Sequence, residues 1–199
     1  MRSLMSCQMG GYGVRSKGLF KYEQGIQIDK NLQLTSSKEG YVRFLRIVDF
    51  TQNTDDIRYV KHPGEKYIID EDNVVMVRYG ASAGFIGTDL SGVLANNLFK
   101  IHYGLLVKNY VRLVFKSPYF ETELKLNTKG GAMPAINFGF LNKFVFPLPP
   151  LPEQQAIVEK VNSLMALCDE LEQQIDNSQT QIEQLMQSCL QEVFEHESN

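Results

Sequence analysis

The sequence contains few of the residues from which proteins build metal and redox sites. Its 199 residues include three cysteines, three histidines and no tryptophan. The cysteines, which share no metal-type spacing, are Cys7, Cys168 and Cys189. The histidines, which lie far apart and without a Cys or Asp ligand frame, are His62, His102 and His196. We therefore predict no metal site and no cofactor, and free thiols in a reducing cytoplasm.

Long apolar runs and the signatures of common enzymes are also absent. No stretch reaches the roughly 18 apolar residues of a membrane-spanning helix, and residues 1–9 lack the apolar core of a secretory signal. The G-x-S-x-G, H-E-x-x-H, Walker and Rossmann frames do not occur. Glu123, Leu124 and Lys125 match the end of a nuclease motif, but no upstream acidic partner is evident. We predict a non-catalytic chain without a membrane segment.

Charge is divided unequally along the chain. Residues 1–150 contain 19 Lys and Arg against 13 Asp and Glu, whereas residues 151–199 contain 1 against 10. The first part therefore carries a formal charge of +6 and the second part −9, which together give −3. Such asymmetry points to an anionic partner for the first part. We interpret the acidic part as the solvated outer face of a helix rather than as a recognition tail.

Four of the seven prolines lie within six residues and mark a structural boundary. Pro147, Pro149, Pro150 and Pro152 fix φ and lack a backbone donor, so the chain around them must be extended. Pro152 suits the first position of a helix, and Glu153 complements the positive end of the helix dipole. We predict that a globular domain ends here and that a long helix begins.

Apolar residues after Pro152 recur in alternating steps of four and three, which is the heptad seam of a coiled coil. With Ser178 as a polar interruption, the seam consists of Ile157, Val161, Leu164, Cys168, Leu171, Ile175, Ile182, Leu185 and Cys189. The stripe is widened by further apolar residues, among them Met165, Leu167 and Met186. A helix of about 45 residues would be roughly 68 Å long, more than one small domain covers. We therefore predict a coiled-coil rod rather than an ordinary core-facing helix.

The first part of the chain predicts an α+β domain. Short strands are expected at residues 26–28, 41–47, 74–79, 94–101 and 143–146. Residues 105–126 predict two helices divided at Ser117-Pro118, with Ser117 as the cap of the second helix. The glycine-rich stretch 78–87 would let its backbone approach DNA or another strand closely. Together these elements predict a twisted mixed β-sheet with flanking helices, followed by the long C-terminal helix.

The junction and the helix resemble part of the specificity subunits of Type I restriction-modification systems. In that family a target-recognition domain ends in proline-rich sequence, a Glu-Gln pair and a long helix. The matching residues are Pro149, Pro150, Leu151, Glu153, Gln154, Ile157, Val158, Leu164, Leu167 and Leu171. The preceding domain is similar in layout, through GYVRFLRIVDF, DNVVMVRYGASAGFIG and KGGAMPAINFGFL. The resemblance implies a target-recognition domain over residues 1–148 and a conserved helix over residues 149–199.

Full-length members of the family have two recognition domains and two conserved helices, which pair as an antiparallel coiled coil. This chain has one of each, so the resemblance implies a half-subunit or a fragment. We expect a homodimer through the helix, which would read a two-part site of inverted symmetry with half-sites about 34 Å apart. The helix is also expected to bind the methyltransferase subunit and, through the complex, the restriction subunit.

The resemblance further implies that the chain recognises double-stranded DNA and leaves catalysis to its partners. Lys and Arg would contact phosphates, and polar side chains would read base edges in the major groove. The candidate DNA-binding residues are Lys17, Arg43, Arg46, Arg78, Ser82, Lys129 and Asn137. Three alternatives stay open: a coiled-coil adaptor without DNA affinity, an inactive remnant of a split specificity gene, and an SH3-type ligand through PLPPLP.

Overall fold

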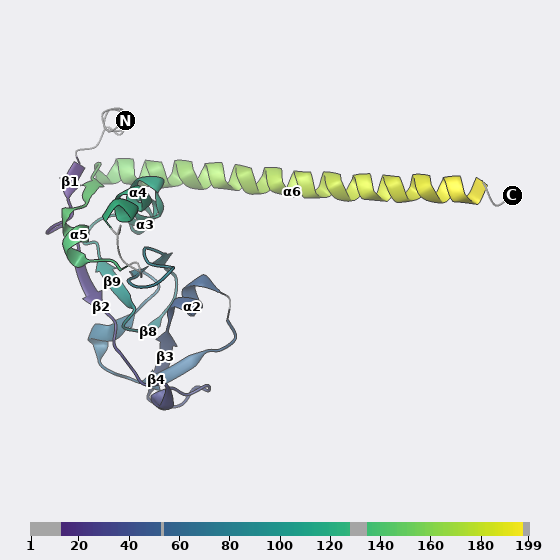
Figure 1. Ribbon diagram of the computed structural model, residues 1–199. Helices are drawn as coiled ribbons and strands as arrows, with labels where there is room; N and C mark the ends of the chain where they lie inside the picture. Colours follow the sequence, from purple (N-terminus) through teal and green to yellow (C-terminus); the bar gives the residue numbers. More distant parts are fainter. Residues whose placement is uncertain (1–12, 53, 128–134, 197–199) are drawn as a thin grey trace. The chain divides into compact units, whose positions relative to one another are not determined.

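The computed structural model describes residues 13–52, 54–127 and 135–196, with side chains up to residue 188. The chain divides into two compact units, residues 1–155 and residues 156–199. The first unit contains every described strand and the shorter helices, and the second contains most of the long helix. Figure 1 labels these elements along the chain. The predicted α+β class, with mixed sheets followed by a long C-terminal helix, is confirmed.

Two four-stranded sheets and one strand pair form the first unit. The first sheet is antiparallel, in the order β2 (Lys21–Gln24), β9 (Leu98–His102), β6 (Val74–Val77) and β7 (Ile86–Gly87). The second sheet has the order β4 (Arg58–Lys61), β3 (Tyr41–Leu45), β8 (Gly92–Leu94) and β5 (Ile68–Ile69). In this sheet β3 and β8 are parallel and the other pairs are antiparallel. The pair joins β1 (Gly13–Arg15) to β10 (Val145–Pro147).

The apolar core lies between the two four-stranded sheets. All four residues of β6 are buried, which fits a strand that has neighbours on both sides. Val75 and Val77 pack in one cluster with Leu45 and Leu94 of the second sheet. A second group of packed side chains is aromatic and joins helices to the strand pair; it contains Phe20, Phe115, Phe120, Phe144 and Phe146.

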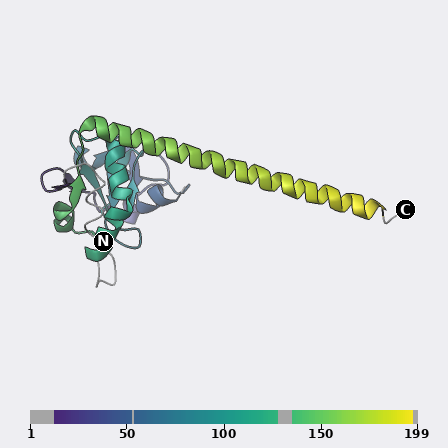
Figure 2. The ribbon, with the colours of Figure 1, turned by 90° about the horizontal axis from the view of Figure 1, so that it is seen from above.

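Four short helices complete the described part of the first unit, and two of them, α3 and α4, are divided at Ser117-Pro118 as predicted. They are α2 (Ile47–Thr51), α3 (Lys108–Lys116), α4 (Pro118–Asn127) and α5 (Phe138–Lys143), with 3-10 turns at Lys30–Leu32 and Glu65–Tyr67. The backbone N–H of Phe120 donates to the Ser117 hydroxyl at 3.3 Å, so the predicted cap of α4 is confirmed. Figure 2 shows α3 and α4 from above.

The strand predicted at residues 26–28 is wrong, because the strand in this part of the chain lies before these residues, at Lys21–Gln24. Gly25 ends it by passing close to the other sheet: a Cβ there would lie 2.2 Å from the carbonyl oxygen of Ala95. Ile26 then donates its N–H to Leu94 at 2.8 Å and forms only an isolated bridge with Ala95. The strand therefore ends at Gly25, where the chain passes beside the other sheet. The alternation of apolar and polar residues in the sequence could not locate that end.

Other predicted strands have different bounds. Residues 94–101 form two strands, β8 and β9, which belong to different sheets and are separated by a turn in which Leu98 donates to Ala95 at 3.0 Å. The strand predicted at residues 41–47 ends at Leu45, because a capping box between Arg46 and Asp49 starts α2. Residues 74–79 form a strand only to Val77, and the strand predicted at 143–146 runs from Val145 to Pro147.

The helix α6 runs from Leu151 to His196, which confirms a long helix directly after the prolines. Its first residue is Leu151, so Pro152 occupies the second position and not the first as predicted. The first bonds of the helix run from the N–H groups of Glu153 and Gln154 to the carbonyl of Pro150, at 2.9 and 3.0 Å. Among the described residues, no helix is both long and apolar enough to cross a membrane.

Candidate nucleic-acid interface

Arg78 lies at the end of β6 between two aromatic rings. Its guanidinium carbon is 4.8 Å from the ring centroid of Tyr79 and 4.7 Å from that of Phe138. Its Nη1 donates to Oε1 of Gln24, and its Nε lies 3.4 Å from the carbonyl oxygen of Ile136. These contacts hold the planar cation in one orientation, which reduces the entropy lost when it binds an anion.

Asn137 is brought next to Arg78 from a distant part of the sequence. The N–H of Ile136 donates to the Arg78 carbonyl at 2.9 Å, and Tyr79 forms a bridge with Ala135. Asn137 caps α5, since its Oδ1 accepts from the N–H of Gly139 at 2.7 Å. Two of the predicted DNA-binding residues therefore share one part of the surface.

Ser82 lies in the tight turn between β6 and β7. Gly80 and Gly84 have φ of +89° and +95°, a region that side chains disfavour, and Ala83 donates to Gly80 at 3.0 Å. The turn forms one wall of an open groove of about 500 Å³, whose other wall comes from α3 and α4 through Phe115, Lys116 and Phe120. At Gly84 the backbone lies close to α4, since a Cβ there would be 2.6 Å from a side-chain carbon of Leu124, whereas a Cβ on Gly80 would meet open space. The predicted approach of this stretch to DNA stays a prediction.

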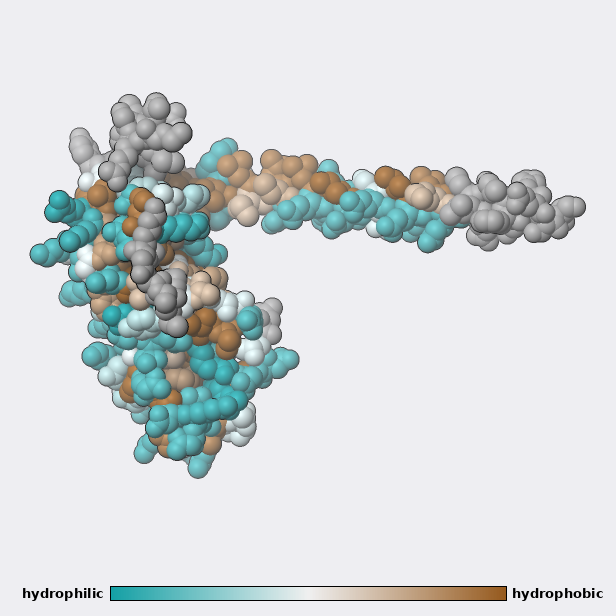
Figure 3. Space-filling view, viewed as in Figure 1, coloured by the Kyte–Doolittle hydropathy of each residue, from teal (hydrophilic) through white to brown (hydrophobic). Residues whose placement is uncertain are grey.

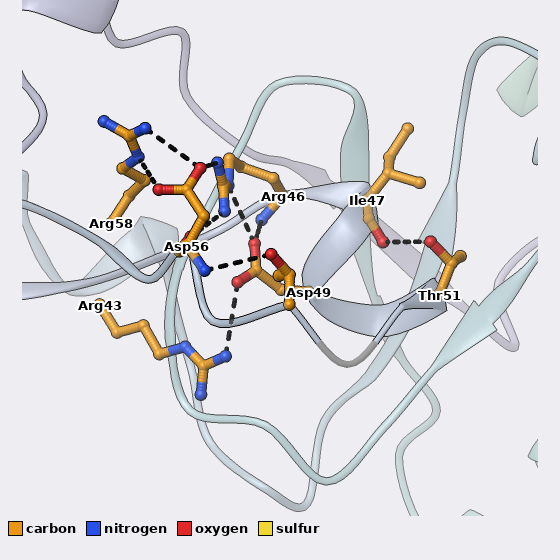
Figure 4. A network of polar contacts seen from close by, with 8 residues as sticks. Arg43, Arg46, Ile47, Asp49, Thr51, Asp56 and Arg58 are labelled. Carbon is orange, nitrogen blue, oxygen red and sulfur yellow. Dashed lines mark hydrogen bonds and ion pairs between the residues drawn. The ribbon is translucent and has the colours of Figure 1, made fainter. Parts of the chain in front are cut away.

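Arg43, in β3 of the second sheet, and Arg46, at the start of α2, join one network of polar contacts, which Figure 4 shows. Arg46 donates through its backbone N–H and its Nε to Oδ2 of Asp49, at 2.8 and 3.1 Å. Nη2 of Arg43 lies 3.4 Å from the other Asp49 oxygen, and the Asp49 side chain is fully buried. Arg46 thus holds the start of α2 through two hydrogen bonds to Asp49, whereas Arg43 makes one long contact and its buried Nε has no hydrogen-bond partner among the described residues.

The network extends to the strand β4 through Asp56. Its carboxylate lies 3.0 Å from Nη1 of Arg46 and 2.7 Å from Nε of Arg58. Hydrogen bonds from Arg58 and then Arg46 lower the pKa of Asp56 below its usual range. Three arginines therefore face two carboxylates, and the network retains one excess positive charge.

The remaining predicted DNA-binding residues lie elsewhere. Lys17 is exposed in the turn after β1, where its N–H donates to the Asn142 carbonyl at 3.1 Å. Lys129 lies outside the described residues. Of the described candidates, Arg78 and Asn137 come together, with Ser82 in the adjoining turn, while Arg43 and Arg46 contact Asp49 and Asp56 in a separate network. Within the described residues, no group of three His, Cys, Asp or Glu side chains is placed to hold a metal ion.

A row of cations on α3 was missed by the sequence prediction. Lys108, Arg112 and Lys116 recur every four residues and therefore lie along one face of the helix. Asp89 lies 2.9 Å from Nζ of Lys108 and 3.9 Å from Nη1 of Arg112. The four-residue spacing was visible in the sequence, but its acidic partner comes from a loop that no local pattern connects to α3.

The α6 helix presents an apolar stripe along one side, which Figure 3 shows in brown above a hydrophilic side in teal. The large apolar side chains of the described part of this stripe are between 48% and 64% exposed; they are Leu164, Met165, Leu167, Leu171, Ile175, Ile182, Leu185 and Met186. Cys168 is an exposed free cysteine on the same helix, and Ile157 and Val161 are half-buried. Cys189 lies beyond the described side chains. Such a stripe is typical of a surface that a partner covers.

The family model for the Type I restriction modification DNA specificity domain matches residues 13–181. The chain belongs to this family. The match includes the strands, α3 to α5 and most of α6, so it spans both units and confirms the family resemblance of the sequence.

Two curated members of the family illustrate the similarity. The chain is 25% identical over 190 residues to the Type I restriction enzyme MjaVIII specificity subunit of Methanocaldococcus jannaschii, which covers 93% of this chain and 43% of the relative. It is 25% identical over 171 residues to the EcoBI specificity subunit of Escherichia coli, which covers 80% and 36%. The chain thus matches about two fifths of the length of these specificity subunits.

Solved structures have the same fold. A chain from a structure of the type I R-M system, described for its assembly and conformational transition, matches with a TM-score of 0.66 at 16% identity. That match covers 88% of this chain and 43% of the other. The HsdS subunit from Thermoanaerobacter tengcongensis matches with a TM-score of 0.61 at 18% identity, over 83% and 40%.

Proposed function

We propose that this chain recognises a DNA sequence as the specificity component of a Type I restriction-modification complex and leaves catalysis to partner subunits. The observation that carries the proposal is the family match, which extends from the first strand into α6 and includes both the globular unit and the helix. The basic character of residues 1–150 agrees with a polyanionic partner.

The DNA contact is proposed for the first unit, with Arg78, Ser82 and Asn137 near its centre. Arg78 is suited to a phosphate or a guanine edge, because the rings of Tyr79 and Phe138 already hold its guanidinium in place. Lys17 and Lys129 would add phosphate contacts. For Arg43 and Arg46 a DNA contact stays a prediction, and Asp49 and Asp56 would compete with phosphate for both side chains.

The helix α6 is proposed to pair with a second copy of itself. Its exposed apolar stripe repeats in heptads, and pairing would remove these side chains from water at about 25 cal/mol per Å² of apolar surface. Its 46 residues extend about 69 Å at ~1.5 Å per residue. That is ample for two half-sites about 34 Å apart on the duplex. We therefore propose a homodimer that reads a two-part site with inverted symmetry.

The partners proposed for the assembled dimer are a methyltransferase subunit and, through it, a restriction subunit. The helix and the end of the globular unit are the proposed binding region, because the family resemblance is strongest there in the sequence. Adenine methylation and DNA cleavage would then be performed by those subunits. In the complex, this chain would contribute only the recognition of the DNA site.

The test combines light scattering with binding of labelled DNA. The purified chain is measured alone and with its methyltransferase subunit, and the mixture is titrated with duplexes carrying candidate sites and scrambled controls. We expect a dimer, a larger complex with the methyltransferase, and tighter binding to one class of duplex. A chain that joins the methyltransferase but discriminates between no duplexes would favour the coiled-coil adaptor. A monomer that never joins the methyltransferase would overturn the proposal.

A further inference from the structure

The outer face of α3 is basic along its whole length. The nine-residue helix contains no Asp or Glu, and it buries Tyr110, Val111, Val114 and Phe115 against the core. Because this side of the helix is buried, Lys108, Arg112 and Lys116 lie on the opposite side. At ~1.5 Å per residue the row is about 12 Å long, which corresponds to about three phosphates of one DNA strand at ~3.4 Å each.

One carboxylate serves the first two cations. Asp89 lies 2.9 Å from Nζ of Lys108 and 3.9 Å from Nη1 of Arg112, and it also accepts a hydrogen bond from the Thr88 hydroxyl. The Thr88 hydrogen bond and then the Lys108 contact lower the pKa of Asp89, so it is ionised at neutral pH. The charges of Lys108, Arg112, Lys116 and Asp89 sum to +2, and Glu121, which lines the adjoining groove, is paired with Lys125.

Lys116 is the cation of the row with no carboxylate within 4.0 Å among the described residues. Its Nζ lies 6.0 Å from the ring centroid of Phe85, and the side chain lines the same groove as Ser82. Burial and the nearby charge of Arg112 lower the pKa of Lys116. A cation placed near another cation without full neutralisation gains free energy when an external anion arrives.

We propose that Arg112 and Lys116 bind the phosphate backbone of the DNA beside the turn that carries Ser82. The inference rests on the proposed function, to which it adds a surface and a chemical role. It places base reading in the turn after β6 and non-specific anchoring on α3, a division that protein–DNA interfaces commonly show. The site would therefore strengthen binding to every sequence equally and would not select among them.

Phosphate suits this face better than an acidic protein does. Protein interfaces have an apolar centre surrounded by a polar rim. On α3 the residues that are not buried are Lys108, Asn109, Arg112, Leu113 and Lys116, so Leu113 is the one apolar side chain among them. The outer face of α3 itself lacks an apolar centre, although apolar side chains, Phe85 among them, line the adjoining groove. The charge and length of the row suit a strand of phosphates.

The experiment measures DNA affinity of the complete complex with its methyltransferase subunit at several salt concentrations. Arg112→Ala and Lys116→Ala should each make the slope of log K against log salt shallower by about 0.9 for one phosphate contact. Preference for specific over scrambled duplexes should not change. Lys125→Ala is the matched control, because Lys125 is exposed on the neighbouring helix and paired with Glu121 at 2.5 Å. It should leave the slope unchanged.

A variant that removes a negative charge instead of a positive one provides a second part of the experiment. Asp89 has φ of +66°, a conformation that Asn adopts readily, so Asp89→Asn preserves the backbone while removing the negative charge. It should tighten DNA binding at a given salt concentration, because Lys108 and Arg112 lose their competitor for phosphate. Circular dichroism of each variant checks that the fold is intact.

The outcomes separate this inference from the proposed function. If the unaltered complex binds no duplex, the proposed function fails. If it binds DNA but the two α3 variants and Lys125→Ala have equal salt slopes, the α3 inference is wrong and the proposed function stands. If the α3 variants lose the methyltransferase subunit without a change in salt slope, the row binds protein, which also contradicts the inference.

Discussion

The side-chain oxygen Oε1 of Gln154 accepts a hydrogen bond from the backbone N–H of Val107, at 3.0 Å. Val107 is the residue directly before α3, and Gln154 lies in the first turn of α6, so one amide joins the starts of two helices. Its Nε2 donates to the carbonyl of Pro149 at 2.9 Å, and the side chain is 1% exposed. Gln154 is also half of the Glu-Gln pair in the family resemblance, which gives that pair a structural role.

Replacing Gln154 should destabilise the first unit. Gln154→Ala leaves the N–H of Val107 and the carbonyl of Pro149 without a side-chain partner, which should lower the free energy of unfolding by about 1 to 3 kcal/mol. Urea denaturation of the full chain measures the loss. Gln155→Ala is the matched control, since Gln155 is exposed at the next position. Equal midpoints for the two variants would show that the buried amide has no special role.

Asp49 should be required for the segment around α2. Asp49→Ala removes the shared acceptor of Arg43 and Arg46 and the capping contact of the helix. Because both arginines are partly exposed and can turn to water, we expect a loss of about 2 to 3 kcal/mol rather than the full cost of a buried unpaired charge. Asp55→Ala, at an exposed position in the following turn, should change the unfolding midpoint little. If Asp49→Ala lowered the free energy of unfolding as little as Asp55→Ala, the network would not stabilise this segment.

Acid should weaken the ion pairs of Asp89. Its pKa in the folded chain lies below the ordinary value of 3.8, so this carboxylate contributes stability above that value and loses it as the pH falls through the folded pKa. The thermal midpoint of the unaltered chain should therefore fall more steeply below about pH 4 than that of Asp89→Asn. Because the Asp89 side chain is 62% exposed, the difference should be small, of the order of a surface pair. Thermal midpoints that fall equally with pH in the two proteins would refute the contribution of Asp89 to stability.

A charge in the apolar stripe of α6 should break self-association. Leu171→Lys places an ammonium group within the proposed seam, where pairing would have to bury it, so the monomer should predominate at concentrations at which the unaltered chain is dimeric. Gln173→Lys makes the same charge change two residues later, on the opposite side of the helix, and should leave the dimer intact. Sedimentation velocity separates the two cases. A Leu171→Lys dimer as tight as the control would exclude this stripe as the interface.

Features that depend on nearby residues were predictable from the sequence. The cap at Ser117, the division between α3 and α4, and the long helix after the prolines each follow from spacings within a few turns. The family resemblance likewise depended on one continuous stretch around Pro149 to Leu171.

Features that depend on residues far apart in the chain were not predictable. Gly25 ends a strand because the backbone of Ala95 passes beside it, and no pattern around Gly25 shows this. The same holds for Arg46, whose partner Asp56 comes through the turn into β4. Arg78 and Asn137 were predicted separately; their proximity depends on the hydrogen bond between residues 78 and 136.

The central claim is that this chain selects the DNA site on which a partner acts. Methylation-site sequencing of DNA from cells that produce the methyltransferase subunit with or without this chain tests it most directly. We predict adenine methylation at one two-part site of inverted symmetry, present only with the chain, and lost or weakened when Arg78 is replaced by Ala. The same methylation pattern with and without the chain would contradict the account.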